Sequence, residues 1–168
     1  ARDFSRTIGA GADPRNLSIL GELAGWRALT DDIHVWDYTT AFNCYPLPLP
    51  NIRTFAANMR AYRDAGVRHA FVQGAWQGNL ASFSELKTWV LAHLMWNPDL
   101  DLEALVRRFM RGYYGKAAPA MRQYYALIED QPALHPELQL FGNTADETCP
   151  YLSPELLERA GSAKAVWG

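Results

Sequence analysis

Two short apolar segments separated by a helical one most constrain how this chain can fold. Residues 32–39 and 67–74 are rich in β-branched and aromatic residues and are short enough to be buried strands. Between them, the apolar side chains of residues 52–62 recur at helical spacing. This strand–helix–strand order predicts a parallel pair, which proteins cover on both faces. Two strands do not complete such a sheet, so the sequence favours an α/β fold in which the chain is a piece of a larger (β/α)8 (TIM) barrel protein. The alternative is a small α-rich domain with a two-stranded appendage.

The second half of the chain has helical periodicity. Residues 83–96, 101–115 and 117–129 follow helical stripes, and Ser153-Pro154 begins a short helix over 155–160. We therefore expect residues 1–98 to contain the β/α units of the barrel, and residues 99–168 to form a helical C-terminal extension. Six aromatic residues lie on these stripes and are expected to pack in the core: Trp89, Trp96, Tyr113, Tyr114, Tyr124 and Tyr125.

Local signals predict where elements begin and end. Asn51 is placed to cap the helix that follows it, and Gly66 is placed to end that helix in the left-handed conformation. Ser82 and Glu85 have the spacing of a capping box, and Asp101 precedes the next apolar stripe. Residues 1–16 have no apolar periodicity, so we expect a loop or a ragged edge there.

Composition excludes several classes of function. The 168 residues carry a net charge of -2 with no long run of either sign, which argues against a nucleic-acid partner. No stretch approaches the roughly 20 apolar residues of a membrane span, and residues 1–10 lack the layout of a signal peptide. Cys44 and Cys149 are too few and too far apart for a disulfide framework or a zinc site. No phosphate loop, HExxH or CxxC motif occurs, and we expect no cofactor and no metal.

The carboxyl ends of the two predicted strands carry the candidate ligand-binding residues. Ligands of parallel α/β folds bind at these ends. Alternation puts Trp36 and Tyr38 toward the barrel interior with Gln73 of the second strand, and Asp37 on the other face of its strand. Trp76 follows in the next loop. Aromatic rings beside amide and hydroxyl groups are suited to a sugar, which stacks its C–H faces on rings and hydrogen-bonds through its hydroxyls.

Structural roles for the same residues stay open. Trp36 and Tyr38 could be core residues at a strand end, and Asp37 could hold a loop as well as touch substrate. His34 and His69 are expected to be hydrogen-bonded interior histidines, because no second ligand lies at metal spacing near either in sequence. A glycosidase needs two carboxyl groups at the bond, and only Asp37 lies at a strand end here. We therefore expect no hydrolase activity from this chain alone.

An ordered set of motifs resembles the DUF4838 family. The resemblance extends over residues 17–129 and rests on WRAL (26–29), VWDYT (35–39), PLPNI (48–52), AGV (65–67), QG (73–74), LMWNP (94–98) and GYYGKAA (112–118). Members of this family are mostly large, exported bacterial proteins. The family is similar to (β/α)8 glycoside hydrolases of the hexosaminidase and α-glucuronidase kind.

The resemblance implies that the chain is the C-terminal fragment of a (β/α)8 (TIM) barrel and that residues 1–98 contain its last β/α units. Residues 33–39 and 68–74 would then be the last two barrel strands. By the same analogy Tyr38 and Trp76 line a sugar subsite, Asp37 and Gln73 bond to hydroxyls, and the catalytic acid comes from a strand outside this chain. The implied partners are a carbohydrate and either the N-terminal barrel half or an oligomer partner, in an exported protein. Two alternatives remain: a non-catalytic carbohydrate-binding module, and a purely structural segment.

Overall fold

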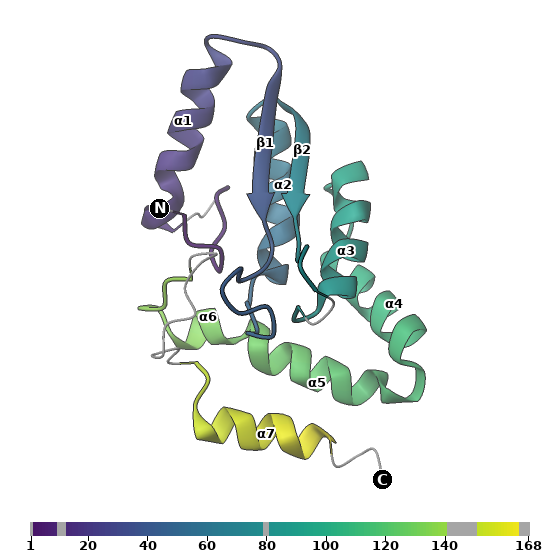
Figure 1. Ribbon diagram of the computed structural model, residues 1–168. Helices are drawn as coiled ribbons and strands as arrows, with labels where there is room; N and C mark the ends of the chain where they lie inside the picture. The colour runs from purple at the N-terminus through teal and green to yellow at the C-terminus, as the bar shows by residue number, and fades with distance from the viewer. Residues whose placement is uncertain (1, 10–12, 79–80, 141–150, 165–168) are drawn as a thin grey trace.

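The computed structural model describes residues 2–9, 13–78, 81–140 and 151–164 (Figure 1). Two parallel strands, β1 (Ile33–Tyr38) and β2 (Val67–Gln73), form a sheet. The α-helices are α1 (Leu17–Arg27), α2 (Phe55–Asp64), α3 (Ser84–Trp96), α4 (Leu102–Tyr114), α5 (Ala118–Glu129), α6 (Gln131–Leu134) and α7 (Pro154–Lys164). Short 3-10 helices cover Pro14–Asn16, Ile52–Thr54 and Gly115–Ala117. The chain is therefore a mixed α/β structure with a two-stranded parallel sheet, which confirms that part of the prediction.

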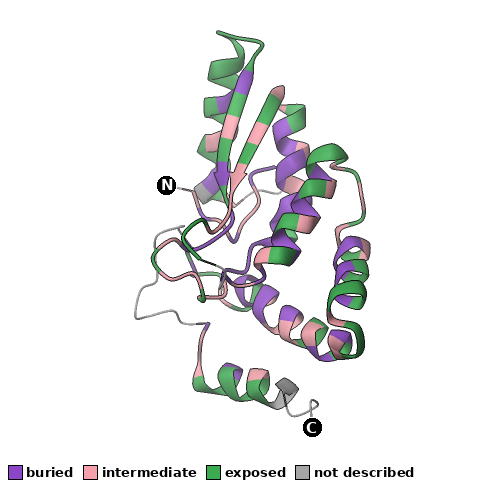
Figure 2. Cartoon of the chain, turned by 45° about the vertical axis from the view of Figure 1, so that its right-hand side comes forward, coloured by how far each residue is buried: buried purple, intermediate pink, exposed green. Residues whose placement is uncertain are grey.

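One face of the sheet is directed toward helix α2 and the other is open to solvent. Figure 2 shows buried and exposed residues alternating along β1. Ile33 and Asp37 are buried, whereas Trp36 between them is 63% exposed. On β2, Val72 packs against the main core and its neighbour Phe71 is 57% exposed. The predicted assignment of side chains to the two faces is confirmed.

The strand pairing contains one irregularity near its start. Ile33 pairs with Val67, but His34 pairs with His69, so that Arg68 is an extra residue on β2. From there the register is regular and ends with Tyr38 opposite Gln73. A β-bulge of this kind redirects the side chains that come after it. Here it sets His34 and His69 opposite each other on the open face.

Two helix boundaries lie where the local signals at Gly66 and Asp101 predict them. Gly66 follows α2 with a φ of 80°, a conformation that glycine adopts without strain. A Cβ at this position would also lie 2.7 Å from the Arg27 Nε, so the Arg27 side chain would have to shift to admit a larger residue. Asp101 caps α4, because its Oδ1 accepts a hydrogen bond from the Ala104 N–H at 3.1 Å. Both predictions are confirmed.

The two other capping predictions are wrong. The Asn51 side chain makes no cap hydrogen bond, and its amide donates instead to the Thr39 carbonyl at 3.2 Å. The Ser82–Glu85 capping box does not form either, because Phe83 lies between Ser82 and α3 in the left-handed conformation, with φ 53°. The ring of Phe83 is buried 5.5 Å from that of Tyr124. Tertiary contacts have replaced local capping at both positions.

Residues 2–9 form a loop that is packed against the rest of the chain. Asp3 and Asn16 are fully buried, and the Asn16 side chain bonds to both the N–H and the carbonyl of Asp3 at 2.9 Å. The Ile8 side chain joins the main core, while its N–H donates to Asn58 on α2 at 3.0 Å. The predicted loop is confirmed. Of the two alternatives, the ragged edge is wrong, because polar side chains, which leave no periodic pattern, hold this segment.

The main hydrophobic core extends from the sheet into the helical half. It includes Ile33 on β1, Leu94 on α3, Met110 on α4 and Tyr125 on α5. Trp96, however, is the last residue of α3 and is 92% exposed, so the expectation that it packs in the core is wrong. Tyr113, on α4, is also exposed, contrary to prediction.

A second, smaller hydrophobic cluster joins the loop before α2 to the segment after α6 and to the residues just before α7. It contains Leu49, Leu138, Leu140 and Tyr151.

The helices of this structure are short. The longest, α3 and α4, each have 13 residues. In the described parts of the chain, no helix combines the length and the apolar character that crossing a bilayer requires.

A buried lysine closes the proline-rich loop between β1 and α2. The Lys87 ammonium on α3 donates to the Thr39 carbonyl at 2.9 Å and to the Leu49 carbonyl at 3.1 Å. These two carbonyls lie at opposite ends of the loop, residues 39–50. The Tyr45 carbonyl in its middle accepts from the Ser82 N–H at 3.0 Å. Helix α3 and the residues just before it therefore fix the loop after β1.

We predict that Lys87→Met lowers the free energy of unfolding by about 1–3 kcal/mol, because it removes the donor to the Leu49 carbonyl and one of the two donors to the Thr39 carbonyl. Chemical denaturation followed by circular dichroism measures this change. Lys116→Met is the matched control, since Lys116 is exposed and its replacement is expected to stay within about 0.5 kcal/mol of wild type. Equal stability of the two variants would refute the role assigned to Lys87.

Candidate functional site

The open face of the sheet brings together three of the predicted site residues. Trp36, Tyr38 and Gln73 point to the same side, near the carboxyl ends of β1 and β2. The Trp36 indole N–H donates to the Gln73 side-chain oxygen at 2.9 Å. Phe71 lies opposite Trp36, with ring centroids 4.9 Å apart in an edge-to-face arrangement. We call these four residues, Trp36, Tyr38, Phe71 and Gln73, the aromatic face.

Trp76 lies in the loop after β2 and is connected to the aromatic face through the loop after β1. Its side chain is exposed, and its backbone N–H reaches the Tyr45 hydroxyl at 3.5 Å. Tyr45 contacts Phe42 with a centroid separation of 6.3 Å, and Phe42 contacts Tyr38 at 5.5 Å. A row of rings therefore leads from the Trp76 loop to the end of β1.

Asp37 lies on the opposite side of the sheet from these residues. Its carboxylate is buried and forms an ion pair with Arg2. Its Oδ2 accepts a hydrogen bond from the Tyr62 hydroxyl of α2 at 2.8 Å, and its Oδ1 accepts from the Tyr38 N–H at 2.7 Å. The carboxylate thus ties the N-terminal segment and α2 to β1. A direct contact between Asp37 and sugar, as the family analogy implied, stays an untested prediction.

Burial governs the ionisation of the groups around this site. Desolvation raises the pKa of Tyr62, which stays protonated and donates to Asp37. Behind the loop, burial lowers the pKa of Lys87, and the charge of Glu129 opposes that shift. Burial likewise raises the pKa of Glu129, although the backbone N–H groups of Arg53 and Ile52 favour its carboxylate. Glu129 accepts from both of these amides, at 3.1 and 3.2 Å.

The aromatic face has the chemistry of a binding surface. It offers an indole, a phenyl ring and a phenol for stacking, together with a hydroxyl and an amide for directed hydrogen bonds. Because the Gln73 oxygen accepts from Trp36, the amide is oriented with its nitrogen available as the donor. The four residues include no carboxyl group, so they do not supply the acid and base of glycoside hydrolysis.

Sequence reasoning missed a second group of polar residues on the open face. His34 and His69 are exposed, not interior as expected, and both lie beside the exposed Asp32. The two histidines are far apart in sequence and meet because the strands pair in register. Arg2 and Lys87 were also missed, since neither belongs to a motif and both act through long-range contacts.

A family model described as a domain of unknown function, DUF4838, matches residues 3–126. The chain belongs to the DUF4838 family. The family resemblance is thereby confirmed, and the match begins upstream of residue 17, where the packed N-terminal segment lies. Neither a curated protein nor a solved structure matches this DUF4838 chain.

We predict that Asp37→Asn destabilises this DUF4838 chain by about 3–5 kcal/mol, because it leaves the Arg2 guanidinium partly buried without its counter-charge. Thermal and urea unfolding measure the loss. Tyr62→Phe removes the hydrogen bond donated to Asp37 and the one accepted from Arg2, and is expected to cost about 1–3 kcal/mol. This smaller loss can still be measured if Asp37→Asn does not fold.

Asp31→Asn is the control for the Asp37 experiment. Asp31 pairs with Arg27 on the surface, where an ion pair contributes about 0–1 kcal/mol. If Asp37→Asn is as stable as the control, the buried ion pair does not anchor the N-terminal segment to β1.

Proposed function

We propose that this chain supplies a sugar-binding surface to a larger (β/α)8 glycoside-hydrolase-like protein that acts on polysaccharide or glycan. The observation that carries the proposal is the aromatic face, where Trp36 is held by Gln73 yet remains largely exposed. Trp36, Tyr38, Gln73 and Trp76 are the residues we assign to sugar. Asp37 supports them from the other side of the sheet through Tyr38 and Tyr62.

The uncovered face of the sheet supports the barrel part of the proposal. Parallel sheets are buried on both faces. Here α2 and the core cover one face, while Trp36 and Phe71 leave a large apolar surface on the other. In a (β/α)8 barrel this face points inward and is covered by the remaining strands. The preceding barrel strands, or an oligomer partner, would cover it here.

The position of the aromatic face supports a ligand-binding role. It lies toward the carboxyl ends of β1 and β2, where barrel enzymes place their active sites. The row of rings through Phe42 and Tyr45 widens the surface toward Trp76. A sugar ring stacked on Trp36 would have the Gln73 amide and the Tyr38 hydroxyl within reach of its hydroxyls.

Because the aromatic face has no carboxyl group, we assign sugar binding to this face and catalysis to other residues. In the leading proposal the catalytic acid and base belong to barrel strands outside this chain. The second candidate, a non-catalytic carbohydrate-binding module, uses the same rings without bond cleavage. Both assign the protein to an exported setting, where glycans are met, and both expect no hydrolysis by this chain alone.

We expect the Trp36 indole N–H resonance to shift saturably when the 168-residue chain is titrated with N-acetylglucosamine or glucuronic acid. The hydrogen bond to Gln73 makes this proton a direct reporter of the face. Trp36→Ala and Trp76→Ala are each expected to weaken binding about tenfold, the loss of about 1.4 kcal/mol of stacking.

Trp96→Ala is the matched control, because Trp96 is the most exposed tryptophan described and lies at the end of α3. Its replacement should leave sugar affinity unchanged. If neither sugar nor their oligosaccharides shift the Trp36 signal, the purely structural alternative is favoured. If Trp36→Ala and Trp96→Ala behave alike, binding does not involve the aromatic face.

A further inference from the structure

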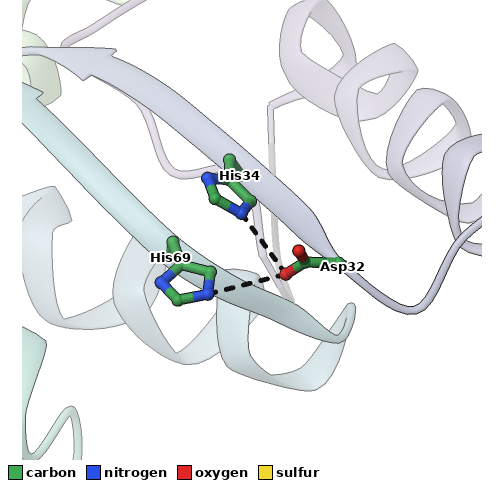
Figure 3. A group of neighbouring side chains, drawn as sticks. All are labelled: Asp32, His34 and His69. Carbon is green, nitrogen blue, oxygen red and sulfur yellow. Dashed lines mark ion pairs between the residues drawn. The ribbon is translucent and has the colours of Figure 1, made fainter.

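The amino ends of β1 and β2 carry a second cluster on the open face, formed by Asp32, His34 and His69 (Figure 3). His34 and His69 face each other from paired positions on the two strands. Asp32 precedes β1, and its carboxylate lies beside both rings. The cluster lies at the opposite ends of the strands from the aromatic face, so a ligand bound by it is independent of the proposed function.

The spacing of the three ligand atoms is that of a small coordination sphere. Asp32 Oδ1 lies 3.3 Å from His34 Nε2 and 3.5 Å from His69 Nε2. Ligands bound 2.0–2.1 Å from a tetrahedral Zn²⁺ are separated by about 3.3–3.4 Å. All three ligand atoms lie within 4.8 Å of one another, and Figure 3 shows both Nε2 atoms directed at the same carboxylate oxygen. Small rotations of these exposed side chains would bring the His34 and His69 ligand nitrogens to the same separation.

The β-bulge at Arg68 is a second, independent feature of this cluster. In a regular register with no bulge, continuation of the Ile33–Val67 pairing would set His34 opposite Arg68 instead of His69. A guanidinium in that place would repel a cation. The bulge replaces it with a second imidazole, whose ring centroid is 4.2 Å from that of His34.

Charge also favours a cation between these groups. The Asp32 carboxylate supplies a negative charge, and each neutral imidazole offers one nitrogen lone pair. A divalent metal bound by these three groups satisfies all three ligands. The Asp32 N–H donates to the Thr30 hydroxyl at 3.1 Å, which helps to fix the turn that carries this ligand.

From this geometry we infer that Asp32, His34 and His69 bind one divalent transition-metal ion, with Zn²⁺ as the best match. Two imidazoles and one carboxylate form a borderline donor set that suits Zn²⁺ better than Ca²⁺ or Mg²⁺, which prefer oxygen ligands. The fourth position is open to water or to a group from the segment that covers the sheet. Because the ion would join the starts of β1 and β2, its role is to hold the strand pair together.

The test is calorimetric titration of the tag-free 168-residue chain with Zn²⁺, in a background with Cys44→Ser and Cys149→Ser to remove thiol ligands. We expect one ion per chain, a higher thermal unfolding temperature with Zn²⁺, and visible absorption of tetrahedral Co²⁺ when Co²⁺ replaces it. His34→Asn and His69→Asn should each lower Zn²⁺ affinity at least about tenfold, as even outer-shell changes weaken metal sites about 10- to 100-fold.

His135→Asn is the matched control. His135 pairs with Glu137, its Nδ1 lying 3.1 Å from the carboxylate, and no third ligand joins this pair among the residues that the structure describes. Its replacement should leave Zn²⁺ binding unchanged. Absence of stoichiometric binding, or equal affinity in His69→Asn and His135→Asn, would overturn the inference. Because all three proposed ligands are exposed, circular dichroism should confirm that the variants fold.

Discussion

The buried contact between Asp37 and Arg2 determines which face of the sheet is covered and which is open to solvent. A carboxylate on the helix side of a strand is costly unless it is paired, and here Arg2 and the Tyr62 hydroxyl both bind it. This arrangement recruits the N-terminal segment into the fold and joins it to β1 and α2. It also fixes which face of β1 is covered. With Asp37 turned inward, Trp36 and Tyr38 must point to the open face.

The open face then divides into two chemically different ends. Toward the carboxyl ends of the strands, rings and an amide form a surface suited to stacking and directed hydrogen bonds. Toward the amino ends, two imidazoles and a carboxylate form a set suited to a cation. In barrel folds the first end is where ligands bind and the second is where stability is provided. The proposed sugar surface and the proposed metal ion therefore have separate roles on one sheet.

Much of the fold could be predicted because it depends on local patterns. The alternation of β1 and β2, the stripe of α2 and the left-handed Gly66 are all encoded within a few residues of each position. The cap expected at Asn51 failed because its side-chain amide donates to the distant Thr39 carbonyl. The capping box expected at Ser82 failed because Phe83, which packs on Tyr124, adopts the left-handed conformation before α3. The candidate site also depends in part on long-range contacts that no local pattern in the sequence reveals. The aromatic residues could be placed by strand alternation, whereas the pairing of His34 with His69 required the register and its bulge.

Thr39 joins the end of the sheet to the loop after β1. Its N–H and hydroxyl both donate to the Gln73 carbonyl, at 3.0 and 3.1 Å, while its own carbonyl accepts from Lys87. Lys87 also holds Leu49, so one ammonium group fixes both borders of the loop. The residues between these borders can consequently be exchanged while the strand ends keep their positions. A frame of this kind would accept a different insert between its borders without rebuilding the sheet beneath it.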